Sequence, residues 1–140
     1  MSAWTSGELE RIASADELEI AAVRRDGTLR KPVTVWVVRL GDDLYVRSVK
    51  GPTGGWFRGT QARHEGRIQA GGVDRDVTFV EADTALSDEV DRAYRTKYRR
   101  YAANIVNSVL TPGARSATLR VVPRESARSA SPRPSRSRRP

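Results

Sequence analysis

Residues 33–49 read VTVWVVRLGDDLYVRSV, and this stretch decides the fold class. Its first half, residues 33–40, is apolar on both faces except at two positions, as in a strand that is buried on two sides. A Gly-Asp pair at 41–42 follows, and glycine tolerates the positive φ that tight hairpin turns require. Residues 43–49 then return as the partner strand. The stretch therefore predicts a core hairpin in a β-rich domain.

Four more strands are predicted around this hairpin, because alternating apolar residues recur at 18–24, 65–70, 73–80 and 117–122. A Gly-Gly pair joins the second and third of them as another hairpin. We expect Asp74 and Asp76 to pair with the neighbouring Arg75 or, across that hairpin, with Arg67, since no partner base or metal-ligand spacing suits them to catalysis.

Helices are predicted at both ends of the strand-rich region. Thr5 and Glu8 have the spacing of a capping box, which predicts a short helix directly after Thr5. Residues 87–105 carry apolar side chains three and four apart, as in an amphipathic helix, and we expect a bend near Tyr101. The tyrosines of this helix should pack on the sheet while its bases face water. A Pro-Gly pair at 112–113 is expected to end the helical region.

The positive charge is distributed unevenly along the chain. Of the formal net charge of +8, residues 124–140 contribute six arginines and one glutamate, a net of +5, which leaves +3 for residues 1–123. We expect one globular domain over 1–123, a common domain size. The Arg/Ser/Pro-rich tail at 124–140 holds too little apolar surface to fold, so it should be disordered. Nucleic-acid binding is therefore expected only through the tail.

The composition excludes several kinds of site. Cysteine is absent, so disulfides and thiolate metal sites are ruled out, and His64 is the only histidine, which excludes a histidine metal cluster. No window approaches the roughly 18 apolar residues that a membrane span needs. We expect a cytoplasmic protein that holds no metal and no membrane segment.

The stretch YVRSVKGPTGGWFR, residues 45–58, carries the candidate binding site. Its glycines let main-chain N–H groups approach an anion closely, just before a short helical turn. Arg47, Lys50 and Arg58 would complete a cradle for a phosphate or carboxylate. The same residues also fit a solvated hairpin exit with ordinary surface bases, and the residues alone leave both interpretations open.

A second basic element, Arg30-Lys31-Pro32, directly precedes the buried strand that carries Trp36. Proline keeps the preceding residue extended, which can aim Arg30 and Lys31 at a ligand lying along the strand. A charged turn in front of a core strand is the commoner explanation of such a pattern.

Taken together, four segments resemble a known family. They are DGTLRKPVTVWVVRLGDDLYVRSVKGPTGGWFRG, GRIQAGGVDRDVTF, VDRAYRTKYRRY and the closing TLRVVPR. Over residues 4–124 the chain resembles the uncharacterised bacterial domain-of-unknown-function family 2255, in the flavin-binding split-barrel superfamily near the deazaflavin-dependent nitroreductases. It differs from these nitroreductases in two ways. Its DRDV strand is acidic, and it lacks the full glycine-arginine-lysine-serine-glycine sequence that precedes the turn in those proteins.

This resemblance implies an α+β, β-rich fold: a split β-barrel of about six mainly antiparallel strands with two or three peripheral helices. It implies a homodimer and an oxidoreductase that uses FMN or a deazaflavin. The cofactor would carry the hydride chemistry, so no protein acid or base is named as catalytic. Arg47, Ser48 and Lys50 would bind its phosphate, Arg30 and Lys31 would neutralise further anionic groups, and Trp36 and Trp56 would flank its ring. The full set of implied cofactor-binding residues is Arg30, Lys31, Trp36, Arg47, Ser48, Lys50, Gly51, Gly54, Trp56 and Arg58.

Two alternatives come from other functional classes. The first is a non-catalytic module on the same fold that holds a small anionic ligand or a protein partner. The second is association of the arginine-rich tail with nucleic acid, whose affinity would fall steeply with salt.

Overall fold

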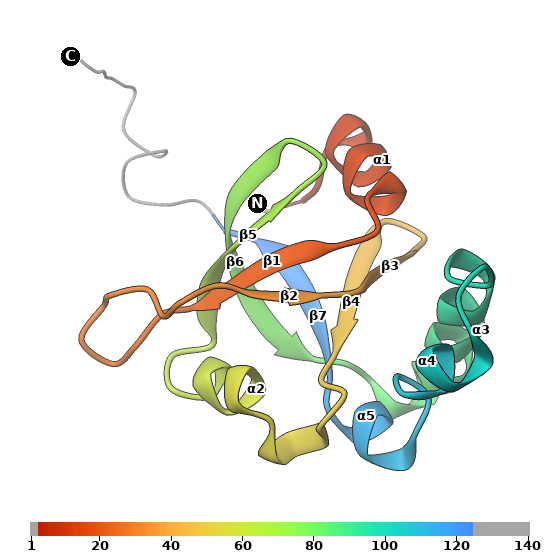
Figure 1. The fold of residues 1–140 in the computed structure, drawn as a ribbon. Coiled ribbons are helices and arrows are strands. Elements are labelled where there is room, and N and C mark those ends of the chain that lie inside the picture. The colour runs from red at the N-terminus through yellow and green to blue at the C-terminus, as the bar shows by residue number, and fades with distance from the viewer. Residues whose placement is uncertain (1–2, 125–140) are drawn as a thin grey trace.

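The computed structural model describes residues 3–124 and confirms a β-rich α+β fold (Figure 1). Seven strands of this part of the chain form one sheet, and neighbouring strands are antiparallel. The strands are β1 (Leu18–Ala22), β2 (Val33–Val35), β3 (Val37–Leu40), β4 (Asp43–Arg47), β5 (Glu65–Ala70), β6 (Val73–Glu81) and β7 (Thr118–Pro123). The α-helices are α1 (Ser6–Ser14), α2 (Gly55–Thr60), α3 (Ser87–Lys97), α4 (Ala103–Asn107) and α5 (Pro112–Ser116), with 3-10 turns η1 (Gly51–Thr53) and η2 (Thr84–Leu86). Except for Arg124, the predicted tail lies outside the described residues.

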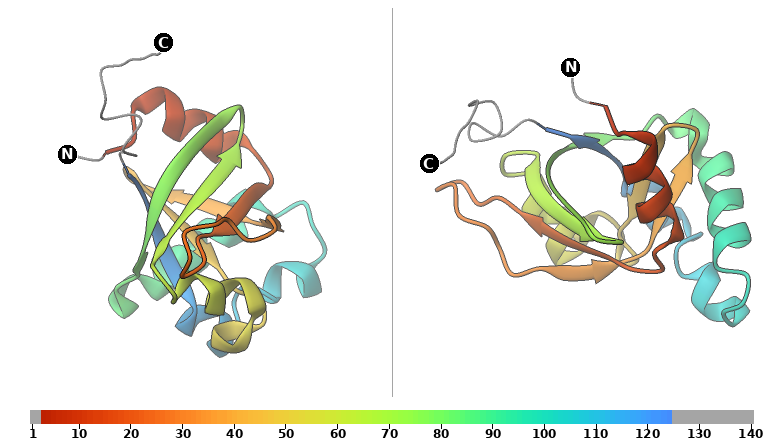
Figure 2. Two further views of the ribbon diagram at one scale, coloured as in Figure 1. Left: turned by 90° about the vertical axis from the view of Figure 1, so that its left-hand side faces the viewer. Right: turned by 90° about the horizontal axis from the view of Figure 1, so that it is seen from above.

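The sheet curls into a nearly closed barrel, and one short stretch of chain supplies both of its edges (Figure 2). The strand order is β2-β1-β5-β6-β7-β4-β3, so β2 and β3 lie at opposite ends although only Trp36 separates them in sequence. The prediction of one continuous strand over residues 33–40 is therefore wrong. Its first half pairs with β1 and its second half with β4. At the β2 edge Val33 is 39% exposed, instead of buried on two sides.

Side chains of α3 satisfy the backbone at this break. The N–H of Val37 donates to the hydroxyl of Tyr98 over 3.1 Å, and the C=O of Val37 accepts from Nζ of Lys97 over 2.8 Å. The Tyr98 hydroxyl itself donates to the carbonyl of Asp16 over 2.7 Å. Buried backbone groups need such partners, so α3 replaces hydrogen bonds that a continuous strand would have made. Burial at this place lowers the pKa of Lys97 to about 8.

The helix predicted over residues 87–105 is broken rather than bent. It divides into α3, which ends at Lys97, and α4, which begins at Ala103. Tyr94 and Tyr98 are fully buried against β3 and β4, as the helical spacing predicted. Burial raises the pKa of both phenols, because it disfavours their charged form.

The caps of the shorter helices follow from local sequence. The capping box of Thr5 and Glu8 is confirmed, with both of its hydrogen bonds present. The Pro-Gly pair at 112–113, predicted to end a helix, instead begins α5. Thr111 accepts a hydrogen bond from the N–H of Ala114 over 3.1 Å, and proline is well tolerated in a first helical turn.

The predicted hairpins are present, and the second one carries the expected ion pairs. Gly71 and Gly72 have φ of 57° and 85°, the left-handed conformation that a tight turn requires. On the flanking strands Arg67 contacts Asp74 at 2.7 Å and Asp76 at 2.6 Å. Local pattern was sufficient to predict this hairpin because all of its partners are near in sequence.

The core occupies the interior of the barrel and leaves one end for a site. Leu9 and Ile12 of α1 join the barrel residues in a single apolar cluster, so α1 closes one end. The segments η1, α2 and α5 gather at the opposite end, where β4 finishes (Figure 1).

We predict that Gly66→Ala unfolds the barrel more readily. A Cβ at Gly66 would lie 2.3 Å from the carbonyl oxygen of Ala21 and 2.7 Å from the ring of Phe79. Such overpacking should lower the free energy of unfolding by about 2–4 kcal/mol, measured by urea denaturation. Gly7→Ala is the matched control, because on α1 the same methyl group would meet only Nη2 of Arg11, at 3.9 Å, and should stabilise by up to about 1 kcal/mol. Equal stability of the two variants would contradict the prediction.

Candidate functional site

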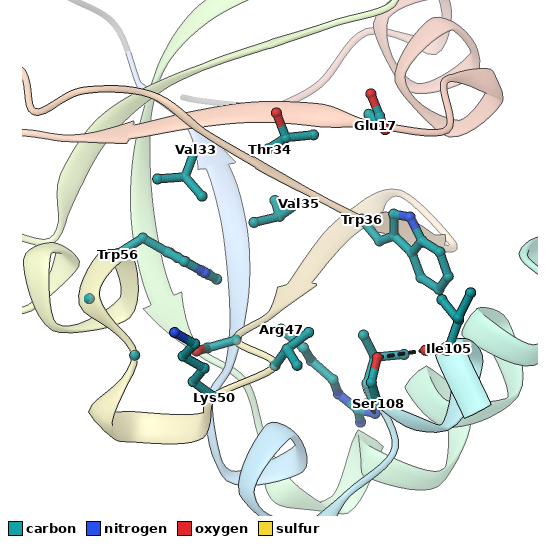
Figure 3. Close-up of a pocket in the computed structure, with 15 residues that line it drawn as sticks. Glu17, Val33, Thr34, Val35, Trp36, Arg47, Lys50, Trp56, Ile105 and Ser108 are labelled. Atoms are coloured by element: carbon teal, nitrogen blue, oxygen red, sulfur yellow. Dashed lines mark hydrogen bonds between the residues drawn. The ribbon is translucent and has the colours of Figure 1, made fainter.

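A cavity of about 570 Å3 lies beside the end of β4, between β2, the η1–α2 segment and α4 (Figure 3). This volume is within the range of small-molecule sites, roughly 300–1,000 Å3. Its lining residues are Glu17, Val33, Thr34, Val35, Trp36, Arg47, Ser48, Val49, Lys50, Gly54, Gly55, Trp56, Ile105, Ser108 and Val109. The structure thus brings together these predicted site residues: Trp36, Arg47, Ser48, Lys50, Gly54 and Trp56.

The hydroxyl of Ser48 is a buried polar group without a partner. Ser48 is 1% exposed, and its Oγ has no hydrogen-bond partner among the described residues. A Cβ on Gly54 would lie only 2.5 Å from this oxygen, so Gly54 leaves room next to it that any other residue would fill. An unsatisfied buried hydroxyl costs about 1–3 kcal/mol. A ligand in the cavity that hydrogen bonds to Oγ would remove this cost.

Aromatic residues lie on opposite sides of the cavity. Figure 3 places Trp56 and Lys50 on the side of α2, and Trp36 and Ile105 on the other side. Trp36 is held by stacking on Tyr98, with ring centroids 3.8 Å apart and planes 3° from parallel. Lys50 is exposed and has no ion-pair partner in the part of the chain that the structure describes. The cavity therefore combines two indoles with one available positive charge.

Arg47 lines the cavity, but its guanidinium is directed into the protein. Its Nε donates to Oγ1 of Thr118 over 2.9 Å, and its Nη1 donates to the carbonyl of Val109 over 2.9 Å and forms an ion pair with Asp91. Its Nη2 donates to the carbonyl of Ser87 over 3.1 Å. Arg47 is 2% exposed and its guanidinium is held by these four residues, so it organises the site from behind.

The remaining predicted residues lie outside this cavity. Gly51 has a φ of 73° and packs against Gly113. A Cβ on Gly51 would lie 3.3 Å from the carbonyl oxygen of Gly113, so this close contact holds η1 against α5. Arg30 and Lys31 line a neighbouring hollow of about 320 Å3. Arg58 lines a third hollow of about 680 Å3, which it shares with Arg30.

Sequence reasoning missed several lining residues. Ile105, Arg24 and Arg25 were not among the expected site residues, and Gly55 was expected only as part of the glycine-containing loop. Glu17 is the only acidic residue that lines the cavity of 570 Å3. Arg24 and Arg25 could have been found by recognising that β1 and β2 pair, because this pairing brings the two arginines that follow β1 beside Arg30. Ile105 had no comparable signal, since its place depends on the break between α3 and α4.

Residues 3–124 contain neither a candidate metal-binding cluster nor a helix that could span a membrane. These residues contain no group of three or more His, Asp or Glu side chains placed to hold a metal ion. None of their helices is long and apolar enough to cross a membrane.

Residues 8–121 match a protein family described as an uncharacterized protein conserved in bacteria, DUF2255. The chain belongs to the DUF2255 family. No curated protein matches this DUF2255 chain.

Several solved structures are similar in fold to this DUF2255 chain. An F420 reductase has a TM-score of 0.54 at 15% identity, covering 89% of this chain and 97% of the reductase. An FAD-binding protein from Mesorhizobium loti has a TM-score of 0.51 at 16% identity, covering 86% and 88%. A putative 5-nitroimidazole antibiotic resistance protein from Bacteroides thetaiotaomicron has a TM-score of 0.50 at 19% identity, covering 88% and 81%. The DUF2255 chain thus shares its fold with these three proteins.

We predict that Asp91→Ala strongly destabilises the DUF2255 chain, because it leaves the buried guanidinium of Arg47 without its counterion. Breaking a buried pair from one side costs about 3–5 kcal/mol, to be measured by chemical denaturation. Asp88→Ala is the control: Asp88 pairs with Arg115 at 2.8 Å but is 81% exposed, so its removal should cost below about 1 kcal/mol. Similar costs for both variants would contradict a structural role of the buried pair.

Proposed function

We propose that this protein binds a flavin or deazaflavin in the cavity beside β4 and acts as an oxidoreductase. The observation that carries the proposal is the buried, unpartnered hydroxyl of Ser48 at a cavity of about 570 Å3 that Lys50 also lines. The fold shared with an F420 reductase and an FAD-binding protein supports the same class of ligand.

The aromatic and apolar lining suits the ring system of such a cofactor. Trp36 and Trp56 come from opposite sides of the cavity, and Val33, Val35 and Ile105 add apolar surface between them. Flat conjugated rings stack on indoles and bury apolar area against aliphatic side chains. We therefore propose that the ring lies between the two indoles, with its side chain directed toward Lys50.

The anionic side chain of the cofactor would lie at the end of β4. The Ser48 hydroxyl would donate to a phosphate oxygen, Lys50 would neutralise its charge, and Gly54 leaves the space that this contact needs. Arg30, Lys31 and Arg58 line the neighbouring hollows and lie outside this first phosphate contact.

A bound flavin or deazaflavin would supply hydride transfer, which moves two electrons and one proton together. The chain's own part is to hold the ring between Trp36 and Trp56 and to exclude water from one side of it. Glu17, beside Trp36, is the one acidic side chain that a substrate in this cavity would meet.

The test is a titration of the purified chain with FMN, FAD and a deazaflavin cofactor, followed by absorbance and calorimetry. Lys50→Ala and Ser48→Ala should each weaken binding, Lys50→Ala by about tenfold, because each loses a hydrogen bond to a charged group. Arg95→Ala removes an exposed base that does not line the cavity, so its affinity should equal that of the parent chain.

The outcomes separate the candidate functions. Absence of binding at high micromolar cofactor would reject the proposal. Tight binding without hydride transfer to any electron acceptor would select the non-catalytic module on the same fold.

We also propose that the chain forms a homodimer through the mouth of this cavity. Val49 and Ile105 line the cavity and are 54% and 45% exposed, although both side chains are apolar. Ile105→Asp should therefore shift the mass measured by light scattering from dimer to monomer. Leu29→Asp is the control, because Leu29 is equally exposed at 46% but lies outside this cavity. A monomeric parent chain at micromolar concentration would reject the dimer.

A further inference from the structure

Three hollows of the structure meet at one glycine. Gly55 lines the cavity of about 570 Å3 beside β4, and it also lines the hollows of about 320 Å3 and 680 Å3 next to α2. Apart from its chain neighbours and the backbone of its own helix, a Cβ on Gly55 would meet no atom within 4 Å. The space in front of this residue is therefore open, and the three hollows adjoin one another at its main chain.

The two hollows beyond Gly55 are strongly basic. Arg24 and Arg30 line both of them, Lys31 lines the smaller one, and Arg25 and Arg58 line the larger one. Asp26 is the single acidic residue among their lining residues, and its carboxylate already accepts hydrogen bonds from Thr28.

Most of these bases lack a counterion. Arg25, Arg30, Lys31 and Arg58 form no ion pair with the described residues. Unpaired like charges that line the same hollow repel one another, and a bound anion would relieve that repulsion.

The local geometry holds two of the arginines in place. Arg24 donates through Nη1 to the carbonyl of Leu29 over 2.7 Å, which fixes it in the β1–β2 connection. Arg30 lies across α2 at Gly59, where a Cβ would come within 3.0 Å of Cδ and Nε of the arginine. A glycine inside a helix is unfavourable by about 1 kcal/mol relative to alanine, and here it gives Arg30 its room.

We infer that the basic hollows are a second anion-binding subsite, which receives the far end of a ligand whose ring lies in the aromatic cavity. The ligand class is an aromatic ring with a side chain that carries at least two anionic groups, either phosphates or carboxylates. The first group binds at Ser48 and Lys50, and the next ones bind beyond Gly55 at Arg25, Arg30 and Arg58. This inference rests on the proposed function, since it names the kind of cofactor side chain that the same site prefers.

The experiment compares riboflavin, FMN and FAD, which carry no phosphate, one and two, by calorimetric titration of the full chain at low and high salt. FAD should bind about tenfold more tightly than FMN at low salt, and the advantage should shrink at high salt. Arg30→Ala combined with Arg58→Ala should remove this advantage and leave FMN binding nearly unchanged, whereas Arg95→Ala should preserve it. Gly55→Ala should keep the Tm of the parent chain and weaken FAD by about tenfold, with riboflavin within about twofold.

Ring-free anions separate this inference from the proposed function. Tripolyphosphate and a tri-glutamate peptide should bind the parent chain and not the Arg30→Ala, Arg58→Ala variant, and the tighter of the two identifies phosphate or carboxylate as the preferred group. If FMN binds but FAD gains nothing and neither ring-free anion binds, the second subsite is rejected and the proposed function stands. If neither a flavin nor the deazaflavin cofactor binds while tripolyphosphate still requires Arg30 and Arg58, the proposed function fails and the anion subsite stands.

Discussion

The whole fold depends on one short stretch of chain, residues 33–40, whose two halves belong to opposite edges of the sheet. β2 and β3 flank Trp36, yet they form opposite edges of the seven-stranded sheet. The sheet can satisfy this only by curling until its edges approach each other, so the covalent chain enforces the barrel. The cost is a backbone that leaves its ladder at Trp36, and Tyr98 and Lys97 of α3 supply the missing partners. Barrel closure and docking of α3 are consequently one event.

The candidate site lies where a second long-range interaction ends β4. Arg47 reaches past the last rung of the strand to Asp91 of α3 and to the carbonyl of Val109, residues that are far away in sequence. The buried pair fixes the direction in which the chain leaves the strand, and Ser48 and Lys50 follow immediately. A charge buried in this way contributes more to a unique arrangement than to net stability, because the loss of hydration offsets much of its attraction.

The sequence was informative wherever the partners of a residue are local. The capping box at Thr5, the Gly-Gly hairpin and the pairs made by Arg67 all involve neighbours within a few positions, and the structure confirms them. The apolar pattern of residues 33–40 does not come from one strand buried on both faces. It comes from two short strands, of which the first pairs with β1 and the second with β4. The predicted role of Arg47 likewise could not include Asp91, because nothing in an isolated strand pattern reveals a carboxylate on a distant helix. Six predicted site residues nevertheless line one cavity, because five of them lie close together in sequence from the end of β4 to the start of α2, and the sixth, Trp36, lies at the break between β2 and β3.

The buried hydroxyl of Ser48 has a thermodynamic consequence. Folding has already stripped it of water, so an arriving oxygen atom need not displace hydration from it and gains nearly the full strength of the new bond. While this hydroxyl has no partner, the end of β4 is less stable by the cost of burying it. Occupancy should thus tighten the segment that joins β4 to α2, and the rigidity of that segment should report whether the cavity is filled.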